Sequence, residues 1–210
     1  MTIFVIPLFE IIAAVFATIY FKKYSKSTER YFLYFLWFTF LTDTTGFFVG
    51  WFFKKDNTWI YIPFMLISFL FYFYWYYTII KKKLFKKIIT LLSLLFVIFA
   101  IKDMITESWN YYHISTFIVG AVIIVITSVF YFSELLNSNE VINIKHKLKF
   151  WIATGLLLFN VGSVPFMIFS KEFDANSNLR NIILVSLNMI LFTCYSLGFI
   201  WAKKENNIND

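Results

Sequence analysis

The most constraining feature of the sequence is a succession of seven long apolar runs separated by short polar segments. Each run approaches or exceeds the about 20 residues that an α-helix needs to cross about 30 Å of hydrocarbon. Transmembrane β-strands are about 10 residues long and alternate apolar with polar positions, and these runs do neither. We therefore predict an all-α fold: a single domain, 1–210, in which seven transmembrane helices form a bundle. The predicted helices are 3–21, 31–53, 59–80, 84–101, 112–135, 148–170 and 179–202.

The positions of the basic residues predict an orientation. With an external amino terminus and a cytoplasmic carboxyl terminus, 14 of the 19 Lys and Arg residues fall in cytoplasmic segments, as the positive-inside rule requires. No basic residue precedes the first run, and Lys22 and Lys23 follow it. This arrangement is typical of a retained anchoring helix, not of a cleaved signal peptide.

Several functional classes are excluded or disfavoured by missing residues. The net charge of +7 is explained by basic loops that set topology and contact anionic lipid, so nucleic acid is not an expected partner. Cys194 is the single cysteine, and the run 179–202 lacks the lysine that a retinal protein needs. His113 and His146 fall on opposite sides of the predicted membrane, which excludes a haem or zinc ion held by both. No cofactor, metal site or catalytic motif is predicted, and an enzyme is unsupported.

Six polar side chains are candidates for a ligand or ion site because of their depth in the apolar runs. They are Asp43, near the middle of the second run, Thr42 and Thr45 beside it, Glu10 in the first run, Asn160 in the sixth and Asn188 in the seventh. A carboxylate at that depth costs about 2.5–3.5 kcal/mol, so it should face the bundle interior. Two explanations stay open. The residues are a functional site, or they are neutral groups that hold helices together by hydrogen bonds.

Two local features refine this hypothesis. Pro7 is expected to open the first helix near Glu10. Ser163 and Pro165, with the glycines of the sixth run, predict a bend around a small cavity at the depth of Asp43. The first, second, sixth and seventh runs are thus expected to converge on one polar site biased toward the outside, with the third to fifth as scaffold.

The densest aromatic run, at 69–77, allows two interpretations. It ends just before Lys81 to Lys83, so an aromatic belt at the membrane interface is the favoured one. The alternative is a stacking wall for a flat apolar ligand such as a quinone or carotenoid.

Four short stretches carry a resemblance to known proteins. They are Trp-Ile-Tyr-Ile-Pro at 59–63, Phe-Tyr-Phe-Ser-Glu-Leu-Leu at 130–136, Phe-Trp-Ile-Ala-Thr-Gly at 150–155 and Tyr-Ser-Leu-Gly-Phe at 195–199. In these the chain resembles a group of small seven-helix membrane proteins of Bacteroidota, which implies the same fold and residence in a bacterial inner membrane. The resemblance also implies an acid in the second span, matched by Asp43, and another shortly after the proline of the third. Phe64 and Met65 stand at the latter place.

The function that these features favour is a receptor-like or sensory membrane module. Its polar site would open outward, and its basic cytoplasmic loops would dock a separate cytoplasmic or membrane protein. The other expected partners are the lipid bilayer and a second copy of the chain. A small transporter or channel for protons, cations or a small solute is the alternative, disfavoured because the inner halves of the runs offer few further polar groups. An intramembrane lipid-modifying enzyme and an accessory membrane effector are the remaining hypotheses.

The predicted orientation is tested by fusing a reporter to the carboxyl terminus. A fluorescent protein that folds only in the cytoplasm should be active there, and alkaline phosphatase, which needs the periplasm, should not. A signal from the phosphatase fusion alone would contradict the orientation.

Overall fold

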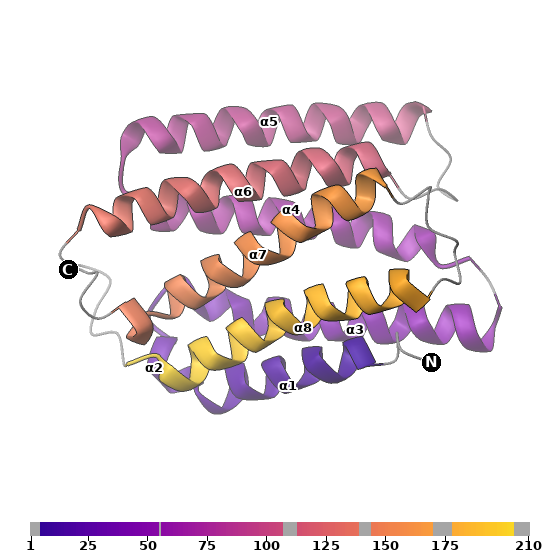
Figure 1. Cartoon of the computed structure of the whole chain (residues 1–210), viewed down its shortest axis with the longest axis horizontal. Coiled ribbons are helices and arrows are strands. Elements are labelled where there is room, and N and C mark those ends of the chain that lie inside the picture. Colours follow the sequence, from indigo (N-terminus) through magenta and orange to yellow (C-terminus); the bar gives the residue numbers. More distant parts are fainter. Residues whose placement is uncertain (1–4, 55, 107–112, 139–143, 170–177, 204–210) are drawn as a thin grey trace.

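The computed structural model describes residues 5–54, 56–106, 113–138, 144–169 and 178–203, and the elements in these ranges are helices, without a strand. Two short helices open the chain, and six longer ones follow them along a common direction (Figure 1). They are α1 (Ile6–Ile19), α2 (Phe21–Tyr24), α3 (Arg30–Phe52), α4 (Thr58–Ile79), α5 (Lys83–Thr106), α6 (Ile114–Leu136), α7 (Leu148–Ile168) and α8 (Asn178–Trp201).

Six of the described helices, α3 to α8, are long and apolar enough to cross a membrane, and many of their large apolar side chains face outward. Leu91 and Ile105 of α5, for example, are 67% and 79% exposed. In water such a surface would drive aggregation, whereas in lipid it is the expected exterior. The chain is therefore a multi-pass membrane protein.

The first apolar run forms a shorter helix than predicted. α1 has 14 residues, which is a length of about 21 Å. α2 continues almost directly from it after a single non-helical residue, Tyr20. Pro7 lies in the first turn of α1, where a missing N–H costs no hydrogen bond, so the expected opening of the helix by this proline is wrong. Residues 3 and 4 of the predicted span lie outside the described part.

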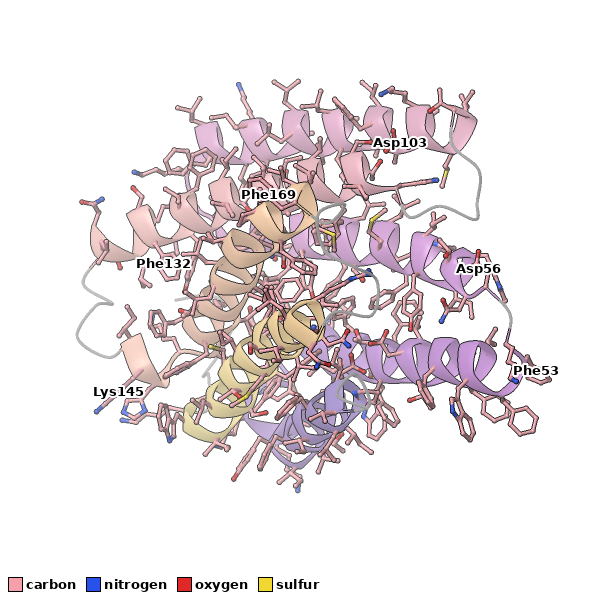
Figure 2. All side chains as sticks on the ribbon, turned by 45° about the vertical axis from the view of Figure 1, so that its right-hand side comes forward. Phe53, Asp56, Asp103, Phe132, Lys145 and Phe169 are labelled. Atoms are coloured by element: carbon pink, nitrogen blue, oxygen red, sulfur yellow. The ribbon has the colours of Figure 1, made fainter. Side chains whose placement is uncertain are left out.

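The neighbours of each helix define the bundle. α1 packs between α3 and α8, α7 packs between α6 and α8, and α5 lies at the edge against α4 and α6 (Figure 1). α1 begins and α8 ends at opposite ends of the bundle (Figure 1). Figure 2 shows Phe53 and Asp56, which flank the α3–α4 connection, at the end opposite Phe132 and Lys145.

Carboxylates fix the connections at both ends. Glu134 of α6 accepts hydrogen bonds from the backbone N–H groups of Lys81 and Lys82, at 2.8 and 2.7 Å, and so anchors the α4–α5 turn. At the opposite end Asp56 accepts bonds from the backbone N–H and the hydroxyl of Thr58, which lower the pKa of its exposed carboxyl group.

The fifth helix, α5, extends beyond the predicted boundary at residue 101. Asp103 is 1% exposed, and its Oδ2 atom accepts hydrogen bonds from the Ser115 hydroxyl and from both the hydroxyl and the backbone N–H of Thr116. These bonds satisfy one oxygen of the carboxylate and a free N–H group in the first turn of α6, whereas Oδ1 has no partner among the described residues. Because the charge finds partners on α6, α5 continues as a packed helix to Thr106.

The interpretation of 69–77 as an interfacial belt is wrong for one of its faces. Phe69, Phe73, Trp75 and Tyr76 are 0–5% exposed and belong to the bundle core, whereas Tyr74 is 58% exposed. Rings from this run pack against α5 and α6, as in the contact of Phe73 with Phe96 at 5.3 Å between centroids. The aromatic content of α4 is thus chiefly a packing device.

The close approach of α4 and α6 gives a stability test. A Cβ atom on Gly120 would lie 2.8 Å from three ring atoms of Phe69, so Gly120→Leu should overpack this contact and destabilise the protein by about 1–3 kcal/mol. The measurement is the midpoint of thermal unfolding in detergent. Val129→Leu, at a 54% exposed position of the same helix, is the control and should unfold like the wild type. Equal midpoints for the two variants would contradict the packing.

Candidate functional site

A cavity of about 300 Å³ lies inside the bundle between α1, α3, α4, α7 and α8, with one side chain from α6. Most of its wall is apolar, and it is rich in Phe, Leu and Met side chains. Four of the six predicted site residues line it: Glu10, Asp43, Asn160 and Asn188. The structure therefore brings together side chains from four helices that are up to 178 positions apart in the sequence.

The two carboxyl groups of the cavity form a pair. Glu10 is 1% exposed, and it lies within hydrogen-bonding reach of Asp43 on the neighbouring helix α3. Ionised carboxylates are acceptors only, so a hydrogen bond between two carboxyl groups requires one of them to carry a proton. Oε2 of Glu10 is buried and has no hydrogen-bond partner among the described residues. The contact between the two carboxyl groups thus leaves at least one acceptor oxygen of the pair without a hydrogen bond.

Tyr61 of α4 lies beside both carboxyl groups and was not predicted as a site residue. Its ring occupies the space that a side chain at Gly46 would fill, because a Cβ atom there would lie 2.6 Å from the Tyr61 hydroxyl oxygen. Asn57 strengthens the same contact by donating its side-chain N–H to the Gly46 carbonyl oxygen at 2.9 Å. Gly46 therefore allows α4 to bring a phenol to the carboxyl pair.

Five other polar side chains on the wall share one arrangement: each donates a hydrogen to the carbonyl oxygen four residues earlier in its own helix. These bonds are 2.7–3.0 Å long and run from Thr39, Ser68, Asn160, Ser163 and Asn188. Such internal bonds are a common way to satisfy hydroxyl groups inside a helix. The hydroxyl hydrogens are thereby already used, whereas the hydroxyl and carboxamide oxygens can still accept hydrogen bonds.

Thr42 and Thr45 do not join the site. Thr45 is exposed, and its hydroxyl donates to the Leu41 carbonyl oxygen at 2.7 Å. Neither threonine lines the cavity. The helical repeat explains this for Thr45, which is rotated away from the face that positions 39, 43 and 46 share, whereas Thr42 lies at the edge of that face.

A layer of hydroxyl groups lies next to the cavity and deeper along α4. Tyr72, on the cavity wall, lies near Tyr195 of α8, whose buried hydroxyl has no hydrogen-bond partner among the described residues. One turn further along α4, the Tyr76 hydroxyl lies 2.6 Å from that of Ser128 on α6. We call these four residues the tyrosine layer. Tyr72, Tyr76 and Tyr195 therefore place hydroxyl groups in the halves of the helices where the sequence predicted few polar groups.

One more buried acid lies outside the cavity, beyond the tyrosine layer. Glu29, at the start of α3, is 0% exposed and accepts a hydrogen bond from the Trp75 indole N–H at 3.0 Å. Sequence reasoning placed it in a loop because it precedes the apolar run. The proximity of Glu29 to Trp75 arises only from the packing of the helices, so no local sequence pattern signals it.

Comparisons with protein-family models, with curated proteins and with solved structures find no match. No cluster of three or more His, Cys, Asp or Glu side chains that could hold a metal ion occurs within the described ranges. The chemistry of the cavity therefore has to be inferred from its own geometry: a partly satisfied carboxyl pair facing an apolar, aromatic space.

The pairing of Glu10 with Asp43 is tested by a double-mutant cycle. Glu10→Leu or Asp43→Leu alone should lower the free energy of unfolding by about 1–3 kcal/mol, because the remaining carboxyl group loses its partner. The double variant should lose less than the sum, with a coupling energy of at least about 0.5 kcal/mol. Unfolding titrations with dodecyl sulfate in mixed micelles measure these values. Additive losses would contradict the pair.

Proposed function

We propose that the chain is a receptor-like membrane module that binds a small molecule in the cavity and acts through a separate protein. The observation that carries this proposal is the carboxyl pair on the cavity wall, with the buried Glu10 Oε2 atom left without a partner. Oε2 of Glu29 and Oδ1 of Asp103 also lack a partner among the described residues, but neither of these acids lines the cavity. An unsatisfied acceptor beside an apolar space is the arrangement of a ligand site.

The proposal includes seven spans with the amino terminus outside, in a bacterial inner membrane. α1 and α2 together run from Ile6 to Tyr24, which supports a first crossing in addition to the six long helices. The distribution of basic residues supports the orientation. In that orientation the carboxyl pair lies in the outer part of the bundle and the tyrosine layer lies toward the cytoplasm.

Packing beyond the cavity favours a receptor over a pore. On the proposed cytoplasmic side of the carboxyl pair, the side chains of Phe32, Trp75, Tyr76 and Tyr195 are 0–2% exposed. Their rings contact one another, as in the pair Phe32 and Trp75 at 5.2 Å between centroids. Such a packed aromatic plug separates the cavity from the opposite surface. A ligand would therefore bind and leave from one side.

A second function, proton transfer across the bundle, is favoured by the tyrosine layer. Hydroxyl groups both donate and accept hydrogen bonds, and Tyr72, Tyr195, Tyr76 and Ser128 follow the carboxyl pair in the direction of the cytoplasm. A measurement of proton flux is needed to distinguish proton transfer from the receptor function.

The receptor proposal is tested with 1-aminoanthracene, a neutral probe whose fluorescence rises in apolar cavities. Ser68 lines the cavity, whereas Ile67 on the same helix is 50% exposed to the exterior. Ser68→Phe should weaken specific probe binding to protein in nanodiscs at least about tenfold, because the new ring fills the cavity. Ile67→Phe, which adds a similar ring on the outside, should bind like the wild type. Equal binding by both variants would contradict the cavity as a binding site.

Two further readouts separate the receptor from the proton-transfer candidate. Saturation with the probe should change hydrogen exchange in the basic segment 81–87, at the end of the bundle away from the site. Proteoliposomes should show no proton flux above protein-free vesicles. Proton flux that is lost in Glu10→Gln would replace the receptor by the transport function.

A further inference from the structure

The cavity also indicates which class of molecule it binds. We propose that the ligand is a small organic cation: a protonated amine attached to an aromatic or similarly apolar body. The ammonium group would lie at Glu10 and Asp43, and the apolar body would lie among the rings of the wall. This inference rests on the proposed function, since it concerns the same cavity.

Charge is the first argument. Among the described residues that line the cavity, two are acids and none is Lys, Arg or His. A carboxylate buried at this depth without a cation is costly. An anionic ligand would add to that cost and a neutral ligand would leave it unchanged. A cationic ligand would balance the one carboxylate that a proton-sharing pair carries, so the electrostatics of the wall select for it.

Hydrogen-bonding capacity is the second argument. The hydroxyls of Thr39, Ser68 and Ser163 already donate to their own helices. Asn160 and Asn188 each donate one N–H in the same way, and neither carboxamide oxygen accepts a bond from a described residue. The remaining donors are the second N–H of each carboxamide and the hydroxyls of Tyr61 and Tyr72. Counted with Glu10 Oε2 and the other carboxyl oxygens, acceptors outnumber them on the wall. A primary ammonium group has three N–H donors and no acceptor, which complements this surface.

The aromatic wall and the size of the cavity are the third argument. The lining includes Phe35, Tyr61, Phe64, Phe159 and Phe192, and aromatic faces attract cations, more strongly where water is excluded. A volume of about 300 Å³ is at the small end of ligand pockets. It is much larger than a bare metal ion needs, and metal ions such as Ca²⁺ require six to eight oxygen ligands. An organic cation uses both the acids and the rings.

Three ligands of similar size and different charge test the inference: 2-phenylethylamine, which is cationic at neutral pH, 2-phenylethanol, which is neutral, and phenylacetate, which is anionic. Calorimetry with the full chain in nanodiscs, corrected with empty nanodiscs, gives each affinity. We expect the amine to bind at least about tenfold more tightly than the alcohol, and the anion not to bind. The amine should also bind more weakly as the pH falls, because protons compete for the carboxyl oxygens.

Conservative variants assign the effect to the acids. Glu10→Gln and Asp43→Asn remove a carboxyl charge and keep the side-chain shape, so each should weaken binding of the amine at least about tenfold and leave binding of the alcohol unchanged. Asp56→Asn makes the same chemical change at an exposed loop position and should bind like the wild type. The other ionisable groups on the wall are Tyr61 and Tyr72 of α4. Tyr61→Phe should retain the pH dependence if the carboxyl pair causes it.

The outcomes distinguish the ligand class from the proposed function. Equal affinities for amine and alcohol, no binding of the amine, or unchanged binding in both Glu10→Gln and Asp43→Asn would overturn the organic cation. The receptor proposal would survive these results as long as Ser68→Phe weakens binding of the neutral probe 1-aminoanthracene at least about tenfold. If Ser68→Phe has no effect on either probe or amine, the cavity itself is refuted, and both proposals fail.

Discussion

Inside a membrane, a polar group has no water to bond with, and this constraint organises the interior of the protein. Most hydroxyl and carboxamide groups meet it locally, by donating to a carbonyl oxygen one turn earlier, as Thr39 and Asn160 do. Carboxyl groups cannot use this solution when ionised, since they have no hydrogen to donate. They have to find partners on other helices. The acids are therefore among the residues that join helices distant in the sequence, as the neutral pair Tyr76 and Ser128 also does.

Each of three acids joins a different set of elements. Asp103 links α5 to the start of α6, and Glu29 links the start of α3 to Trp75 of α4. The third, Glu10, meets another acid, and in each of these three acids one buried carboxyl oxygen has no partner among the described residues. The first two arrangements explain stability without invoking a ligand. The last one leaves an acceptor oxygen beside a cavity, which is why the function is placed there.

The long helices could be predicted because the thickness of the hydrocarbon layer sets their length, and their apolar composition indicates that they lie in lipid. Membership of the cavity was predictable for Asp43 and Asn160 from the energetic cost of their depth, but not for Tyr61, whose place depends on the close approach of α4 at Gly46. The aromatic run of α4 was misassigned because Trp75 and Tyr76 suit an interface and a core equally well by composition. Only tertiary contacts decide between these environments: Trp75 packs on Phe32 and bonds with Glu29, and Tyr76 lies beside Ser128.

The position of the carboxyl pair on α1 and α3 has a consequence for biosynthesis. These helices leave the ribosome before the other long helices, and amino-terminal segments generally assemble first. Glu10 and Asp43 can therefore meet in the bilayer while α4 to α8 are still being made, which removes part of the penalty of inserting two acids separately. The last helix, α8, packs against α1 and closes the cavity around a pair that is already formed. The polar site thus precedes the fold that encloses it.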